Sequence, residues 1–153
     1  MSHHVHPIGP PGGIPLAAAR AGIDAAVKAA GDRGVGVVVA VAAASGDPIA
    51  LARMDGVPPL AAESAMRKCR TVALTWRSTE SFAAALKGDL ETEPEFFHGM
   101  HHVGPMMTIG GGVPVLIGGR LAGAVAVSGA STADDIALAG LAAAAIAAAA
   151  GGR

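Results

Sequence analysis

Hydrophobic residues have helical periodicity at the start of the chain and form strand-like apolar runs after it. From Pro15, which suits the first turn of a helix, apolar residues recur every three or four positions as far as Gly31, and this spacing predicts the first helix. The next apolar run, residues 35–43, is nearly continuous and rich in valine, which is typical of a buried strand. Turn residues at 45–48 precede another apolar stretch over 49–54, so we expect a hairpin.

The middle of the chain returns to helical patterns and then loses its periodicity. Pro58 and Pro59 open a predicted helix that runs to about Trp76, and a shorter helix follows over 79–87. Residues 88–112 show no clear period. Long irregular segments in compact domains are usually functional or mobile, so either is expected of this segment.

The last third of the chain predicts a second hairpin and a final helix. Apolar strands over 113–117 and 120–128 flank a Gly-Gly pair, which is typical of a tight hairpin. Ser131 and Asp134 fit the capping box that opens a helix, so we assign Asp134 to the cap and expect Asp135 to be the freer carboxylate. Hairpins in place of alternating strand–helix–strand units predict an antiparallel sheet flanked by helices, which is an α+β domain.

Length and composition fit one domain preceded by a flexible arm. Residues 1–13 are rich in proline and glycine and lack an apolar targeting core, and the remaining 14–153 suffice for a single domain. The composition is 52% hydrophobic but only 3% aromatic, and the net charge of -1 argues against nucleic acid as a partner. Because Cys69 is the only cysteine, an intrachain disulfide and a cysteine-based zinc site are excluded.

Residues 136–152 form an uncharged, alanine-rich run that nearly reaches membrane-spanning length. Alanine contributes little to membrane insertion, so we expect a helix that is buried or faces another subunit. We therefore predict a cytoplasmic protein that has no membrane partner and forms a homo-oligomer through this helix.

Five short motifs occur in the order in which one known family has them. They are ARMDG (52–56), RKCRTVAL (67–74), GGGVPV (110–115), GAVAVSGAS (123–131) and DDIALAGL (134–141). Over about 14–150 the chain therefore resembles the GlcG/HbpS family, to which the C-terminal domain of PduO-type proteins is related. The resemblance implies a profilin-like, three-layer fold with a five-stranded antiparallel sheet flanked by helices. It also implies a small ligand, which is haem in several members.

The same resemblance implies which positions bind the ligand. The family patterns R-x-D-G, K-x-x-T, G-G-x-P and S-G with a following Asp fall on Arg53, Asp55, Gly56, Lys68, Thr71, Gly111, Gly112, Pro114, Ser128, Gly129 and Asp135. Among these, the expected ligand-binding residues are Arg53, Asp55, Lys68, Thr71, Gly111, Gly112 and Ser128. The chain departs from the family pattern at Cys69 and Val72, where small residues are common, and in the histidine-bearing segment 95–102.

Three histidines in that segment, His98, His101 and His102, are the candidates for chemistry. Imidazole is a common metal ligand, and a separation of three or four residues puts His98 on the same helical face as His101 or His102. Glutamates within 91–95 could complete a nitrogen and oxygen site for zinc or iron. The same imidazoles could act as a general base, and the alternative is a solvated loop with incidental histidines.

The other candidate residues also have two interpretations each. The glycines at 110–112 either direct backbone N–H groups at a carboxylate or haem propionate, or they permit a close backbone approach. Arg53 and Asp55 either contact a ligand or close a turn. Basic neighbours could lower the pKa of the Cys69 thiol, although a buried structural thiol is the favoured interpretation.

Two functions follow from these candidates. The first is a haem- or tetrapyrrole-binding protein, in which Lys68 and the glycines hold propionates. Either a histidine of the 98–102 segment binds the iron, or no histidine does. The second is an enzyme for a small oxygenated substrate. In that case His98, His101 or His102 serve as general base or bind a divalent metal, and Arg53 or Lys68 holds a substrate carboxylate. A subunit that binds no ligand is the third interpretation.

Overall fold

The structure is a computed structural model in which residues 13–151 are described. The predicted arm over 1–13 lies, apart from Gly13, outside the described residues. The elements in chain order are α1 (Leu16–Asp32), β1 (Val38–Ala43), β2 (Pro48–Arg53), α2 (Pro59–Thr75), α3 (Thr79–Thr92), α4 (Pro94–Gly99), the 3-10 turn η1 (Met100–His102), β3 (Gly112–Ile117), β4 (Arg120–Ser128) and α5 (Thr132–Gly151).

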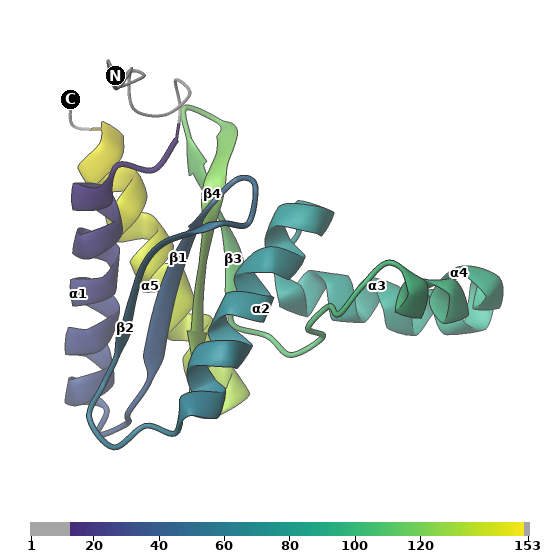
Figure 1. Ribbon diagram of the computed structural model, residues 1–153, viewed down its shortest axis with the longest axis horizontal. Helices are drawn as coiled ribbons and strands as arrows, with labels where there is room; N and C mark the ends of the chain where they lie inside the picture. Colours follow the sequence, from purple (N-terminus) through teal and green to yellow (C-terminus); the bar gives the residue numbers. More distant parts are fainter. Residues whose placement is uncertain (1–12, 152–153) are drawn as a thin grey trace, which may run out of the picture.

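The strands form one antiparallel sheet in the order β2-β1-β4-β3 (Figure 1). Each predicted hairpin is present, and the two hairpins join because β1 pairs with β4, from Val38 opposite Ser128 to Ala43 opposite Gly123. This pairing places β1 and β4 in the middle of the sheet, where both faces of each strand are covered. A strand buried on both faces needs apolar residues at consecutive positions, which explains the continuous run in β1.

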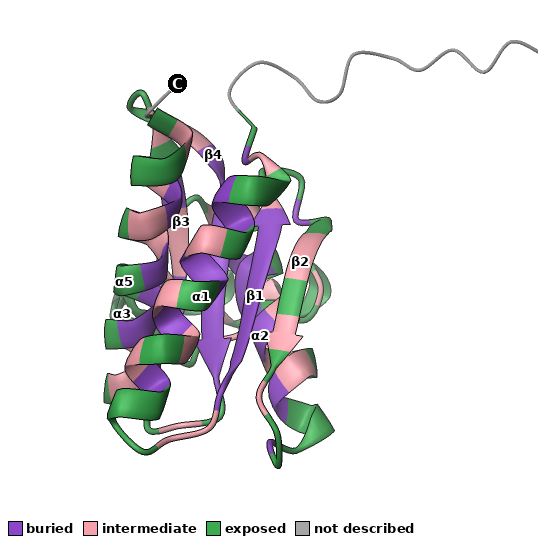
Figure 2. Ribbon diagram, turned by 90° about the vertical axis from the view of Figure 1, so that its left-hand side faces the viewer, coloured by how far each residue is buried: buried purple, intermediate pink, exposed green. Residues whose placement is uncertain are grey.

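Helices cover both faces of the sheet, with α1 and α5 on one side and α2 on the other (Figure 1). Because successive side chains of a strand point to opposite faces, Val39 and Val41 pack toward α1 and α5, while Ala40 and Ala42 pack toward α2. Figure 2 shows β1 buried along its length. The prediction of an α+β domain with an antiparallel sheet flanked by helices is confirmed, and the sheet is open.

The C-terminal helix α5 is long and apolar enough to cross a membrane by length and composition. One side of it, carrying Leu138, Ala142 and Ile146, is fully buried, and the helix packs on α1 and the sheet. The two helices approach closely because α1 carries Gly22 at the crossing, where a Cβ atom would lie 2.9 Å from the Ala142 carbonyl oxygen. The opposite side of α5 is exposed and uncharged, and a homo-oligomer formed through it stays a prediction.

Two expectations about the architecture were wrong, namely the number of strands and the lack of regular structure over residues 88–112, where α3 ends and α4 and η1 lie. The sheet formed by the described residues has four strands, where the resemblance implied five. The chain between α2 and β3 supplies no fifth strand because most of it is helical: α3 continues to Thr92, and α4 and η1 follow. The helix predicted over 79–87 is the first part of α3, but its end and α4 were not predicted because Gly88 interrupts the apolar pattern and Pro94, in the first turn of α4, separates the two helices. The helices α3 and α4 project from the rest of the fold (Figure 1).

Candidate ligand-binding site

A cavity of about 640 Å³ lies between α3 and the segment that follows α3 in the chain. One face of α3 supplies part of its lining, and the rest comes from α4, η1 and the loop after η1. The lining residues are Phe82, Ala83, Leu86, Lys87, Leu90, Phe97, Met100, His101, Gly104, Pro105, Met106 and Thr108. Most of these side chains are apolar, and Lys87 and His101 are the two titratable residues among them.

Of the three candidate histidines, only His101 lines this cavity. Its ring lies edge-on to the ring of Phe97, with the centroids 6.4 Å apart and an interplanar angle of 82°. His98 makes a similar edge contact with Phe97, at 5.3 Å and 84°, and belongs to α4. His102 ends η1, and all three histidines are exposed, although His101 alone is among the residues that line the cavity. The three imidazoles therefore do not share one cavity.

The predicted metal site is not formed in the described part of the chain. Between residues 13 and 151, no three side chains of His, Cys, Asp or Glu come close enough together to hold a metal ion. The glutamates at 91, 93 and 95 are exposed at the end of α3 and the start of α4.

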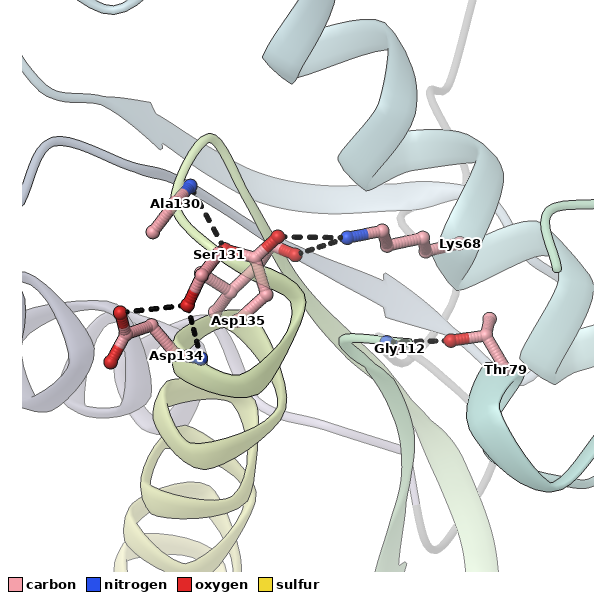
Figure 3. A network of polar contacts seen from close by, with 8 residues as sticks. Lys68, Thr79, Gly112, Ala130, Ser131, Asp134 and Asp135 are labelled. Carbon is pink, nitrogen blue, oxygen red and sulfur yellow. Dashed lines mark hydrogen bonds and ion pairs between the residues drawn. The ribbon is translucent and has the colours of Figure 1, made fainter. Parts of the chain in front are cut away.

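A buried polar cluster lies elsewhere in the fold, where α2, β4 and the start of α5 meet (Figure 3). Lys68 Nζ donates hydrogen bonds to the Val127 carbonyl oxygen at 2.8 Å and to Asp135 Oδ2 at 3.2 Å. Asp135 Oδ1 accepts a hydrogen bond from the Ala130 backbone N–H at 3.1 Å. The side chains of Lys68 and Asp135 are only 1% and 5% exposed, so the two charges neutralise each other away from water.

Burial and ion pairing shift the pKa of each of the two residues in opposite directions. Burial lowers the pKa of Lys68, although the nearby Asp135 carboxylate raises it. Burial likewise raises the pKa of Asp135, while the Lys68 ammonium lowers it. Each charge is therefore tolerated in the interior only because the other is present.

The capping-box prediction for the start of α5 is confirmed, but the assignment of Asp135 as the freer carboxylate was wrong. Ser131 Oγ accepts a hydrogen bond from the Asp134 N–H at 3.1 Å and donates one to Asp134 Oδ2 at 2.9 Å. Arg33 also pairs with Asp134 at 2.7 Å, and its hydrogen bond lowers the pKa of that carboxyl. Asp134 is thus the partly exposed carboxylate, bonded to Arg33 and Ser131, whereas Asp135 points inward to Lys68.

The glycine segment serves close packing. A Cβ atom on Gly111 would lie 2.7 Å from the Val127 carbonyl oxygen and 2.9 Å from Lys68 Nζ, and the residue has φ +117°. The Gly112 N–H donates to Thr79 Oγ1 at 3.0 Å (Figure 3). Of the two interpretations of these glycines, the structure shows the close approach, with the Gly112 N–H already bonded inside the protein.

The remaining residues expected to bind ligand lie in three different places. Thr71 is fully buried on α2, one helical turn after Lys68, and Ser128 is buried at the end of β4. Arg53 and Asp55 are exposed at the end of β2 and in the turn after it. The structure therefore brings Lys68 and Gly111 together, while none of these expected ligand-binding residues is among the residues that line the cavity beside α3.

Cys69 is a buried structural thiol, as the favoured interpretation proposed. Its Sγ lies 3.4 Å from the Ala40 carbonyl oxygen, to which it donates, and its neighbours are core residues on the α2 side of the sheet. Burial raises the pKa of the Cys69 thiol to about 12, and the attraction of Lys68 lowers it only in part. The alternative of a reactive thiol with a lowered pKa is wrong, because desolvation outweighs the basic neighbours.

Sequence reasoning missed the contribution of α3 to the cavity, Lys87 included. The signal was available, since Phe82, Leu86 and Leu90 are spaced four residues apart and form an apolar face that the central fold does not cover completely. Lys87 lies beside that face and was missed because it belongs to no recognisable motif.

The chain is similar in sequence and fold to a known family of proteins. The family model of the "Haem degrading protein HbpS-like" family matches residues 14–146. Protein GlcG of Escherichia coli K12 is 36% identical over 93 residues, which are 60% of this chain and 63% of GlcG, so the match spans less than two thirds of that relative.

Solved structures match over most of their length. A double mutant of HbpS from Streptomyces reticuli has a TM-score of 0.75 at 28% identity, with 94% of this chain and 97% of HbpS covered. A complex of PduOC with haem has a TM-score of 0.74 at 26% identity, with 87% and 94% covered. The protein ORFY of Klebsiella pneumoniae has a TM-score of 0.79 at 24% identity, with 97% and 98% covered, which supports the fold alone.

Proposed function

The chain belongs to the HbpS-like family, and from this premise we propose that it binds haem or a related tetrapyrrole in the cavity beside α3. The observation that carries the proposal is the position of His101. It is the one histidine of the predicted cluster that lines an apolar cavity, and imidazole is a frequent axial ligand of haem iron. The haem complex of the similar PduOC structure supports the same ligand class.

The lining of the cavity fits a flat, largely apolar ligand that carries carboxylates. The volume of about 640 Å³ falls in the range of roughly 300–1,000 Å³ that is usual for small-molecule and cofactor sites. Phe82, Leu86 and Leu90 offer an apolar surface on one side, and Phe97 and Met106 offer another. Carboxylates on the ligand require a cation, and the cavity contains one in Lys87.

Each residue has a distinct role in this proposal. His101 would hold the iron, and Lys87 would pair with a propionate. We assign the propionate to Lys87 because the ammonium group of Lys68 is buried and already bonded to Asp135 and Val127. The apolar side chains would exclude water from the macrocycle. Haem, when bound, would supply a redox-active iron whose properties depend on the residue that holds it.

Blocking the cavity tests where the ligand binds. Ala83 lines the cavity, whereas the adjacent Ala84 is exposed on α3 and is not among the lining residues. We expect Ala83→Phe to weaken haemin binding by at least about tenfold, because the added ring occupies the space of the ligand, and Ala84→Phe to leave the affinity within about twofold. Absorbance titration in the Soret region measures both.

The titration should use the full-length chain with His3→Ala, His4→Ala and His6→Ala, which removes adventitious binding by the N-terminal histidines. Saturation at one haemin per chain, lost in Ala83→Phe only, supports the proposal. Equal affinity of the two phenylalanine variants would place the haemin elsewhere and contradict it.

A further inference from the structure

One wall of the cavity is a strap of chain, residues 104–112, that leads from η1 to β3. Gly104, Pro105, Met106 and Thr108 of this strap line the cavity. The first half of the strap has no regular secondary structure, so no helix or strand hydrogen bonds hold it in place. The shape of the cavity therefore depends on what anchors the strap.

Two buried threonine hydroxyls hold the strap. Thr71 Oγ1 accepts a hydrogen bond from the Met107 backbone N–H at 2.8 Å, and Thr79 Oγ1 accepts one from the Gly112 N–H at 3.0 Å. Both threonines are fully buried. Thr71 also donates its hydroxyl proton to the Arg67 carbonyl oxygen at 2.8 Å, which leaves its oxygen lone pairs for Met107.

The C-terminal end of the strap is fixed more firmly than its middle. Gly111 is packed against Lys68 Nζ and the Val127 carbonyl oxygen, and the Val127 N–H donates to the Gly111 carbonyl oxygen at 2.9 Å. The middle of the strap has the Thr71 contact instead. Met107 lies between Met106 and Thr108 in the chain. The hydrogen bond from its N–H to Thr71 therefore determines how these two neighbours are oriented toward the cavity.

We propose that Thr71 is a positioning residue of the ligand site, which orients Met106 and Thr108 by holding the backbone of Met107. This inference rests on the proposed function for its ligand, and on the hydrogen bond for its mechanism. It gives a role to the Lys68-x-x-Thr71 pair on α2: the two side chains lie one helical turn apart, where Lys68 supports the end of the strap and Thr71 its middle.

The test compares three variants of the full-length chain. Thr71→Val keeps the shape but removes the acceptor, Thr71→Ser keeps the hydroxyl, and Thr75→Val is the matched control on the same helix. Thr75 is suitable because its hydroxyl bonds only within residues 71–77, to the carbonyl oxygens of Thr71 and Arg77 and the Arg77 N–H. Two readouts are measured: haemin affinity with the Soret spectrum, and amide hydrogen exchange at residues 106–108 without ligand.

Thr71→Val is expected to weaken haemin binding about tenfold, because the partly buried Met107 N–H loses its acceptor, and to speed exchange at residues 106–108 by a similar factor. Thr71→Ser should restore both, and Thr75→Val should change neither. Unchanged exchange and affinity in Thr71→Val would overturn the inference. If the parent chain binds no haemin, the proposed function fails. The exchange readout then decides the inference alone: faster exchange confined to Thr71→Val upholds the positioning role, and equal exchange in all variants refutes it.

Discussion

Replacing Lys68 with methionine is expected to lower the free energy of unfolding by about 3–5 kcal/mol, the usual cost of removing one partner from a buried ion pair. Asp135 would keep its place at the start of α5, with a side chain only 5% exposed, but without the ammonium that now lies 3.2 Å from it. The Ala130 N–H would remain as its hydrogen-bond donor, which compensates only in part.

Urea denaturation of the purified chain at neutral pH measures this effect. The matched control is Lys28→Met, since Lys28 also pairs with an aspartate at 3.0 Å but with a side chain that is 79% exposed, and we expect a change within about 0.5 kcal/mol there. The double variant Lys68→Met with Asp135→Leu should recover much of the lost stability, because it leaves no unpaired charge. A loss below about 1 kcal/mol in Lys68→Met would contradict the described pairing.

Replacing Gly111 with alanine is expected to cost about 3 kcal/mol or more, because two unfavourable effects coincide there. The residue has φ +117°, outside the conformations that side chains favour. The new Cβ atom would also lie 2.9 Å from both Lys68 Nζ and Asp135 Cβ, and 2.7 Å from a backbone oxygen. Room could be made only by disturbing the buried ion pair.

The matched control is Gly88→Ala within α3, where a Cβ atom meets nothing within 4 Å. Alanine is the better helix former, so this variant should gain roughly 0.5–1 kcal/mol. The two alanine variants, unfolded under the same conditions, should therefore shift in opposite directions. Similar stability of Gly111→Ala and the parent chain would show that the strap does not approach α2 as closely as described.

The sheet and its helices could be predicted because their signals are local. The valine-rich run of β1, the Gly-Gly turn between β3 and β4 and the capping box of α5 each appear within a few consecutive residues. The fifth strand came only from the resemblance, and no apolar run in the sequence supported it. The end of α3 and the whole of α4 were harder to find because Gly88 and Pro94 break the pattern, although Pro94 is compatible with the first turn of a helix.

The candidate site was predictable only in part because burial depends on partners that are distant in sequence. Lys68 and Asp135 are separated by 67 residues, so the sequence could not show that each charge neutralises the other. The histidine cluster was identified, but which imidazole enters a cavity depends on how α4 and η1 turn against α3. Lys87 was missed because nothing in its neighbourhood distinguishes it from a solvated lysine before the cavity is known.

The central claim is that His101 faces haem iron in the cavity beside α3. The most direct test is the Soret spectrum of the haemin complex of His101→Ala, compared with His102→Ala, which removes the adjacent imidazole that does not line the cavity. We predict that His102→Ala keeps the spectrum and the affinity of the parent chain. In His101→Ala the Soret band should shift and the affinity should fall by about tenfold or more, since even the loss of a residue that only supports a metal ligand costs about 10–100-fold. An unchanged Soret band and affinity in His101→Ala would contradict the assignment.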